Sequence, residues 1–382
     1  MGNPTRKTNR SQEHPMHNPT DDYIANDDMS YFLNDLNMDY HDEQILWDPS
    51  TQPNQNQQLA ALIEIEERLK QLTSSHPWFD PATVIQSTPC GSGLIKLADD
   101  PLLDELKSIV ASLTGILDHS EGAYSLQPPP YTKSFLQAFK SCSHLHKSIM
   151  DEPLPMTQSA AAQVVNDLNH RLWSWYQCLS LPSFGIEYAR LKRNSRDNYR
   201  RFCRLADSLF GCCSRLLVVR IDLGYSETDG YYIDHETADY HRKKLCRMFH
   251  SHPMFEHLLG YAWKLEWRPK KGFHYHFVFF FDGNRVRRDI ALGRSIGELW
   301  RRLTNNQGMY FNCNHSGGSN YLYNALGDIH YSDDLKREHL DKIAAYLTKV
   351  DEYVSLAVKG RTFQTSSTPR ASEKRGGRPR LY

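Results

Sequence analysis

The sequence predicts an α+β protein, with a central antiparallel sheet flanked by helices and a mostly helical region before it. Apolar residues recur at helical spacing through residues 59–210. The pattern changes near Arg215, where RLLVVRIDLGY reads as a strand buried on both faces. Further on, YAWKLEWRPKKGFHYHFVFFFDG reads as two strands around a Pro/Gly turn. Strands that alternate with helices around such a hairpin are typical of an α+β domain.

The first half of the chain divides into three stretches. Residues 1–57 are rich in Asn, Asp, Gln, Ser and Pro, and we predict a disordered acidic arm. Residues 58–130 are predicted as a helical segment and linker, with Asp100 as an N-cap and PPP at 128–130 in the linker. Residues 131–210 are predicted as a helical region. The predicted helices are 59–74, 101–117, 135–150, 160–179 and 188–210.

The second half is predicted to be one α+β domain over residues 211–360, followed by a tail. Helices are expected at 289–303 and 335–358, with the stretch YFNCNHSGGSNY as a loop between them. The tail, residues 361–382, has no apolar period and carries six basic residues against a single acid. It is predicted to be disordered and able to touch a phosphate backbone.

Charge is unevenly distributed along the 382 residues, although the net charge is zero. Residues 191–382 hold 33 basic and 21 acidic side chains, whereas residues 1–190 hold 12 and 24. A basic half is typical of a protein that binds a polyanion. The chain has no apolar run long enough to span a membrane and no signal-peptide pattern at its start, so we expect a cytoplasmic protein with no membrane partner. Eight cysteines without a CxxC pair fit reduced thiols.

The segment GFHYHFVFFFDG carries two candidate metal ligands. Side chains alternate between the faces of a strand, so His274 and His276 point the same way and can grip one metal ion. The same pattern also occurs when two half-exposed histidines sit at the end of a strand. Taken alone, the two histidines leave both interpretations open.

The preceding strand adds a carboxylate to these histidines. A turn over residues 268–272 places Glu266 opposite His274, on the same side of the sheet. Two imidazoles and one carboxylate leave coordination positions open for water and a phosphate oxygen, which suits catalysis. The alternative is a cross-strand ion pair between Glu and His. Asp222 is a second possible carboxylate, and Arg220 on its face could hold a phosphate.

The helical segment KIAAYLTKVDEYV carries a candidate nucleophile. Tyr346, Lys349 and Tyr353 lie on one face beside an apolar stripe. A tyrosine oxygen can attack a phosphodiester when a metal polarises the phosphate and a cation steadies the developing charge. The alternative is that Tyr346 is a core aromatic residue and Lys349 a surface charge.

Two further groups of residues have a possible binding role. Basic side chains recur after the HxH strand next to Trp300 and Tyr310, a mixture that suits contact with DNA, or else a solvated helix face. Those assigned to DNA binding, together with Arg220, are Arg285, Arg287, Arg288, Arg301 and Arg302. A zinc site is also conceivable within residues 246–257, but the run is broken by a proline and completes no familiar spacing. It would use Cys246, His250, His252 and His257.

Three motifs together resemble those of HUH endonucleases, the rolling-circle replication initiators. They are HYH between apolar residues, the strand LLVVRIDL before it and the helix carrying YLTK after it. More narrowly, several stretches are similar to the inovirus replication protein family, also called the YagK/YfjJ C-terminal domain. These stretches are GYAWKLEW, KGFHYHFVFFFDG, IGELWRRL, YFNCN, IHYSD and AAYLTKVDEYV. The resemblance covers residues from about 211 to 365.

The resemblance implies a ferredoxin-like HUH palm that acts on single-stranded DNA at a phage replication origin. His274 and His276 would bind Mg²⁺ or Mn²⁺, with Glu266 as the third ligand. Tyr346 would cut the strand and form a 5′-phosphotyrosine, with Lys349 positioning the phosphate. The better-known phage initiators place two tyrosines four residues apart. Here the spacing is seven, so one nucleophile is assumed.

Two functions follow, from different classes. The first is a metal-dependent nickase and ligase that initiates rolling-circle replication of a phage or prophage, with a host helicase and polymerase as partners, because the chain has no P-loop of its own. The second is a DNA-binding regulator that keeps the initiator fold without cleaving DNA. The intact HxH, Glu266 and YxxK favour the first, because a binder does not need them.

Overall fold

The structure is a computed structural model, and the part of the chain that it describes runs from Gln55 to residue 368 with gaps. The described residues are 55–75, 77–87, 95–97, 100–118, 126–139, 156–230, 232–268, 272–315, 324–349, 355–356, 358 and 360–368. The predicted acidic arm therefore lies almost entirely outside them, as does the tail beyond residue 368. Among the described residues no helix is both long and apolar enough to cross a membrane.

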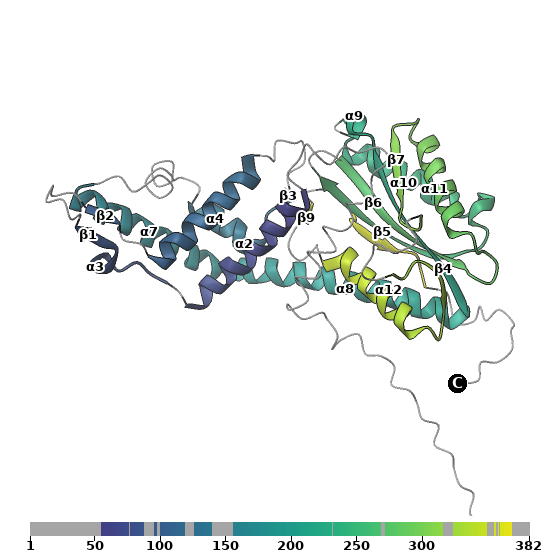
Figure 1. The fold of residues 1–382 in the computed structure, drawn as a ribbon, viewed down its shortest axis with the longest axis horizontal. Helices are drawn as coiled ribbons and strands as arrows, with labels where there is room; N and C mark the ends of the chain where they lie inside the picture. Colours follow the sequence, from purple (N-terminus) through teal and green to yellow (C-terminus); the bar gives the residue numbers. More distant parts are fainter. Residues whose placement is uncertain are drawn as a thin grey trace, which may run out of the picture.

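In its described residues, the N-terminal region packs three helices of 18 or more residues and one of ten residues around one apolar core (Figure 1). A small two-stranded sheet, absent from the prediction, packs beside them. Buried Glu66 caps the helix Pro130–Phe139. Its carboxylate accepts hydrogen bonds from the backbone N–H groups of Tyr131 and Thr132 at the helix N-terminus, where a negative charge stabilises a helix. The elements are α2 (Gln55–Ser75), α3 (Pro81–Val84), β1 (Ile85–Ser87), β2 (Ile95–Leu97), α4 (Pro101–Asp118), β3 (Leu126–Gln127), α5 (Pro130–Phe139) and α7 (Gln158–Leu179).

Helix α8 (Pro182–Cys212) connects the helical region to the sheet (Figure 1). Its first half contacts α5 and α7, and its second half packs on α12 and the sheet. The second half buries Phe202, Leu205, Leu209 and their neighbours against the sheet at helical spacing. One continuous helix therefore belongs to both parts of the molecule.

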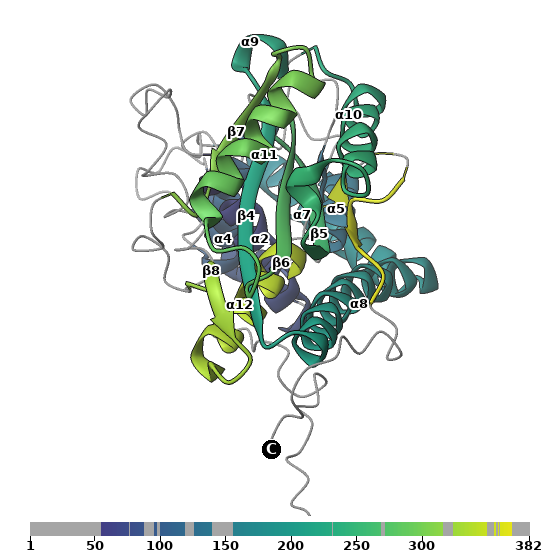
Figure 2. The same ribbon diagram turned by 90° about the vertical axis from the view of Figure 1, so that its right-hand side faces the viewer.

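The C-terminal part is a six-stranded antiparallel sheet with helices on both faces (Figure 2). The strand order is β10-β5-β6-β4-β7, with β8 also paired to β4. The elements are β4 (Arg215–Tyr225), α9 (Glu227–Gly230), α10 (His235–Met248), a 3-10 turn (Pro253–Phe255), β5 (Leu258–Arg268), β6 (Gly272–Asp282), α11 (Asp289–Leu303), β7 (Gly308–Asn312), β8 (Gly327–His330), α12 (Asp334–Lys349), β9 (Ser355–Leu356) and β10 (Phe363–Thr365).

The alternation of side chains along β6 separates two cores. The odd-numbered residues of β6 from Phe273 to Phe281 face α10 and α11. Val278 and Phe280 face α8 and α12. His274 and His276, at the start of β6, lie on the same face as Val278 and Phe280, because residues two apart in a strand share a face. The α8/α12 face therefore holds the candidate metal ligands.

The outer edge of β4 is shared by two short strands, and Asn314 joins them. β7 pairs with the far end of β4 and β8 with its beginning. Between the two ladders, buried Asn314 accepts a hydrogen bond from the Arg220 N–H at 2.9 Å and donates one to the Val218 carbonyl at 2.9 Å. A side-chain amide thus replaces the backbone partners that this gap lacks.

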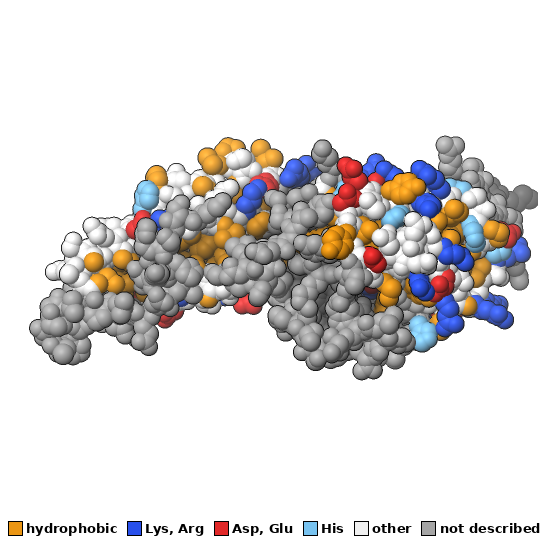
Figure 3. Space-filling view, turned by 90° about the horizontal axis from the view of Figure 1, so that it is seen from above, with side chains coloured by type: hydrophobic (Ala, Val, Ile, Leu, Met, Phe, Trp, Pro, Cys, Tyr) orange, Lys and Arg blue, Asp and Glu red, His pale blue; other side chains and the backbone are white. Residues whose placement is uncertain are grey.

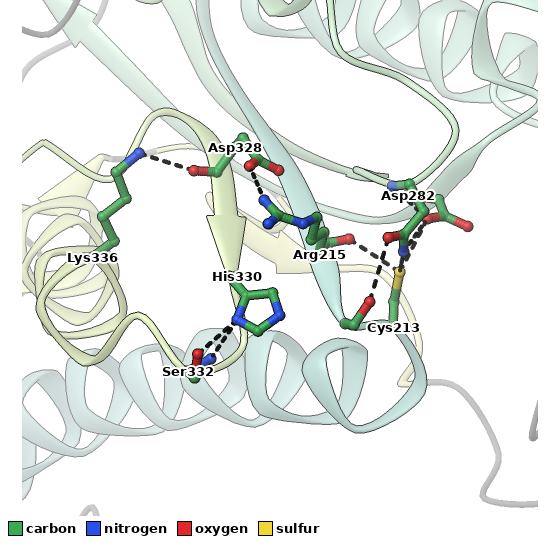
Figure 4. Close-up of polar contacts among 9 residues, drawn as sticks. Cys213, Arg215, Asp282, Asp328, His330, Ser332 and Lys336 are labelled. Atoms are coloured by element: carbon green, nitrogen blue, oxygen red, sulfur yellow. Dashed lines mark hydrogen bonds and ion pairs between the residues drawn. The ribbon is translucent and has the colours of Figure 1, made fainter. Parts of the chain in front are cut away.

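A polar corner fixes the junction between α8 and β4 (Figure 4). The Cys213 thiol lies 3.1 Å from the Asp282 carboxylate at the end of β6 and 3.0 Å from the Arg215 carbonyl. Arg215 forms an ion pair with Asp328 of β8, whose carbonyl accepts a hydrogen bond from Lys336 of α12. These contacts tie the end of α8 to three strands and a helix.

Most predicted helices are observed, and the differences are local. Asp100 caps α4 through hydrogen bonds to two backbone N–H groups, and α11 has the predicted bounds. The loop expected around YFNCN contains β7. The last helix was predicted too long, since Ser355–Leu356 form a strand paired with β3. The tail was predicted as disordered, but Phe363–Thr365 pair with the free edge of β5 because buried Phe363 anchors them.

Candidate metal centre and its tyrosine

The hairpin β5–β6 has the register that the sequence predicted. Glu266 pairs with His274 and Trp267 with Phe273 across the two strands. Gly272 opens β6 with a φ of +64°, a left-handed conformation that favours glycine, and a Cβ there would lie 2.5 Å from the Gly230 carbonyl oxygen. The turn thereby sets the register that brings the carboxylate and both imidazoles together.

Three ligand atoms converge on the α8/α12 face of this hairpin. The Nε2 atoms of His274 and His276 lie 3.4 and 3.3 Å from the same Oε2 atom of Glu266. The three ligand atoms all lie within 4.8 Å of one another. The three side chains are at most 14% exposed. Within the described ranges this is the one group of three or more His, Cys, Asp or Glu residues that could hold a metal ion, and the zinc site weighed for residues 246–257 does not form.

Asp222 on β4 orients one of the two imidazoles. Its Oδ1 atom accepts a hydrogen bond from Nδ1 of His276 at 2.7 Å. On the other ring, Nδ1 of His274 lies 3.4 Å from the Gly272 carbonyl oxygen. A hydrogen bond at Nδ1 turns Nε2 toward the opposite side, where a metal would be bound. Asp222, the second possible carboxylate, therefore contacts the Nδ1 side of His276, away from the Nε2 atom that would bind the metal.

The electrostatics of the cluster favour ionised carboxylates. Burial lowers the pKa of His276, but the carboxylates of Asp222 and Glu266 outweigh it and raise this pKa to about 9. Burial raises the pKa of Asp222, but His276 and Arg220 lower it to about 2. The two histidines likewise hold the pKa of Glu266 well below its ordinary value. Without a metal, the proton of His276 provides the positive charge that the carboxylates require.

Tyr346 lies beside this cluster. It comes from α12, is half-buried, and its ring centre is 6.4 Å from that of His276. The guanidinium of Arg220 lies 5.1 Å from the centre of the same ring and 3.7 Å from Asp222. Lys349 is the last residue of α12, and its side chain is outside the described part, as is Tyr353. The structure thus brings Tyr346, Arg220, Asp222 and the three candidate ligands to one face.

Lys264 belongs to the same face and was not among the site residues predicted from the sequence. It lies on β5 two residues before Glu266, pairs across the hairpin with His276, and is 3% exposed. The period of two that placed Glu266 opposite His274 would also have placed Lys264. Its burial is not expected from the sequence, because a lysine in a strand is usually solvated.

The predicted DNA-binding arginines fall into two sets. Arg220 is 5% exposed and sits inside the cluster, where it could meet only a phosphate that enters the site. Arg285, Arg287, Arg288 and Arg302 are exposed, and Arg301 is partly exposed with an ion pair to Glu298. These five follow β6 in the turn and in α11, the helix on the opposite face. Lys and Arg side chains gather over the part of the molecule that carries the sheet (Figure 3).

One comparison with known proteins gives a match. Residues 185–362 match the family model described as the YagK/YfjJ C-terminal domain. The match begins within α8 and ends just before β10, so it includes every strand of the sheet except β10, the three candidate ligands and Tyr346. No curated protein and no solved structure matches the chain.

Proposed function

We propose that this protein is a site-specific nickase and ligase of single-stranded DNA of the HUH type, dependent on a divalent cation, with Tyr346 as nucleophile. One observation carries the proposal: Glu266, His274 and His276 converge within 4.8 Å on the sheet face where the Tyr346 ring lies 6.4 Å from His276. A metal set and a phenol side by side are what phosphotyrosine chemistry requires.

The donor atoms suit a divalent cation. Two imidazole nitrogens and one carboxylate oxygen fit Mn²⁺ better than Mg²⁺, since Mg²⁺ prefers oxygen ligands throughout. Asp222 supports the set by holding His276 at Nδ1. A bound cation would polarise a phosphate oxygen and make the phosphorus open to attack. We therefore expect activity with both ions and tighter binding of Mn²⁺.

The Tyr346 oxygen would form a bond to phosphorus while the bond from phosphorus to the 3′-oxygen breaks. The phenolic proton passes to water, and the leaving oxygen takes up a proton to become a 3′-hydroxyl. The protein then carries a 5′-phosphotyrosine, which a 3′-hydroxyl can attack to rejoin the strand. Arg220, which contacts the Tyr346 ring, orients the phenol. Lys349, one helical turn after Tyr346, is the proposed cation for the phosphate.

The fold supports the same proposal. Apart from the short helix α9 and the 3-10 turn, the elements β4, α10, β5, β6, α11 and β7 follow each other as β-α-β-β-α-β, and the strands lie in the order β5-β6-β4-β7. This succession is that of the ferredoxin-like fold, which the resemblance to HUH initiators implies for the palm. The candidate ligands lie on the two strands of its central hairpin.

The biological setting that we propose is initiation of rolling-circle replication at a phage or prophage origin. The 3′-hydroxyl left by the nick would prime a host polymerase, and a host helicase would open the duplex. The exposed arginines after β6 would contact the phosphate backbone near the origin.

The test is an adduct assay. The protein is incubated with Mn²⁺ and single-stranded DNA from its own genomic neighbourhood and then run on a denaturing gel. We expect a shifted covalent adduct that disappears with EDTA, with Tyr346→Phe, and with replacement of His274 or His276. Tyr346→Phe should still bind DNA, because only the attacking oxygen is lost.

Tyr240→Phe is the matched control, since this exposed tyrosine lies on α10, on the other face of the sheet. Its adduct should equal that of the wild type. DNA binding without an adduct across the whole neighbourhood would contradict the proposal and indicate a regulator. Full adduct formation by Tyr346→Phe would contradict the assignment of the nucleophile.

A further inference from the structure

A row of arginines lines the outward face of α8. The residues are Arg190, Arg193, Arg196, Arg200, Arg201 and Arg204, and all are exposed except Arg200, which is partly exposed. Apart from the adjacent pair Arg200 and Arg201, they recur at steps of three and four residues, whereas Ser195, Phe202 and Ala206 are buried on the opposite side of the helix. The row spans about 21 Å at 1.5 Å per residue.

None of the six forms an ion pair within the described part of the chain. Helix α8 carries three acids: Glu187 is paired with Lys133, Asp207 is paired with Arg337, and Asp197 lies among the six arginines, so the row has a net charge of +5. Arg196, Arg200 and Arg204 stand four residues apart, and like charges at that spacing destabilise a helix. A stripe with this excess of positive charge is typical of a surface that binds a polyanion.

The arginine stripe provides positive charge but no exposed aromatic side chains on which DNA bases could stack. Tyr188 packs edge-on against Tyr131, and Tyr199 packs against the core between α8 and the sheet. Sites for single-stranded DNA combine positive charge with stacking aromatic side chains. Contacts to phosphates alone suit a duplex, and about 21 Å corresponds to roughly six base pairs at 3.4 Å each.

The stripe is fixed relative to the candidate site. The second half of α8 packs with α12 on the face that holds Tyr346 and the three ligands. The Cys213 corner then ties the end of α8 to β6 and β8 (Figure 4). DNA that leaves the site along this face toward the helical region would run along α8.

We propose that the arginine stripe of α8 binds the phosphate backbone of duplex DNA beside the single-stranded segment that is cut. The position of that duplex rests on the proposed function. The binding of duplex by α8 does not, so the two can fail separately.

The experiment compares the salt dependence of duplex binding in two variants of the full-length protein. Arg193→Gln/Arg196→Gln removes two charges from the stripe. Lys243→Gln/Arg247→Gln removes two exposed charges from α10, on the other face of the sheet. Affinity for a labelled blunt duplex is measured by fluorescence anisotropy between about 50 and 200 mM salt. The same proteins are tested for adduct formation on a short single strand.

We expect the α8 variant to reduce the slope of log affinity against log salt by about 1.8, at 0.9 per lost phosphate contact. Over the fourfold change in salt, the wild type would then lose about 12-fold more affinity than this variant. The α10 variant should keep the wild-type slope, and both should form the adduct on the short strand. An unchanged slope in the α8 variant, or an equal reduction in both, would overturn the inference. A reduced slope in the α8 variant, with no adduct from any of the proteins, would support duplex binding by α8 and would refute the proposed function.

Discussion

Raising the pH should destabilise the metal-free protein, and Mn²⁺ should reverse the loss, because under the proposed function His276 would bind either a proton or the cation. Its pKa is about 9, since the Asp222 and Glu266 carboxylates outweigh the effect of burial. A group whose pKa is higher in the folded state than in the unfolded state stabilises the fold fully below the unfolded pKa. That contribution is then lost as the pH rises through the folded pKa.

The size of the effect follows from the shift. From 6.5 to about 9, at 1.36 kcal/mol per pKa unit, the proton on His276 contributes about 3 kcal/mol that disappears between roughly pH 6.5 and 9. Asp222 sets the acid limit: its pKa is lowered to about 2, so its contribution is present above pH 4 or so and is lost as the pH falls. Mn²⁺ must displace one proton, so its affinity should rise about tenfold per pH unit up to pH 9 or so.

Denaturant unfolding in EDTA at several pH values, for the wild type and for His276→Gln, isolates this contribution. The wild type should lose stability between about pH 6.5 and 9 relative to the variant. Calorimetry in two buffers of different ionisation enthalpy should give about one proton released per Mn²⁺ near pH 7. Equal pH dependence in both proteins, or an Mn²⁺ affinity that does not change with pH, would refute the competition.

Two further predictions concern the scaffold, and both are measured by denaturant unfolding. Asn314→Ala should cost about 2–4 kcal/mol, because it leaves the Arg220 N–H and a neighbouring carbonyl buried without a partner; wild-type stability would contradict the bridging role. Gly297→Ala should destabilise by about 1–2 kcal/mol despite its better helix propensity, because the new Cβ would lie 2.2 Å from the Tyr310 ring. Gly211→Ala, with open space around it, should not destabilise, and equal effects would refute the packing argument.

The parts of the site that the sequence could predict are those fixed by local rules. The period of two and the length of the turn determine which residues of a hairpin face each other, so Glu266 lies opposite His274 as predicted. Helical spacing likewise placed Tyr346 beside the apolar stripe of its helix. These arguments use only residues that are close in the sequence.

The parts that could not be predicted depend on distant pairings. Asp222 reaches His276 only because β4 lies next to β6, a contact between residues 54 apart. The sharing of β4 by β7 and β8 through Asn314, and the addition of β10 at the edge, also join segments far apart in the chain. Periodicity gives the face of a strand but not its neighbour. The order of the strands therefore had to come from the structure.

The charges on the α8/α12 face bear on the choice between an enzyme and a regulator. Lys264 and Arg220 are nearly buried beside Asp222 and Glu266, and buried ion pairs are often no more stabilising than well-packed apolar residues. With His276 neutral and a divalent cation bound, these four charges and the cation sum to +2, which suits an incoming phosphodiester. In the proposed nickase, a phosphate that enters this face of the sheet would meet these buried groups, whereas a regulator that binds DNA from outside does not require them.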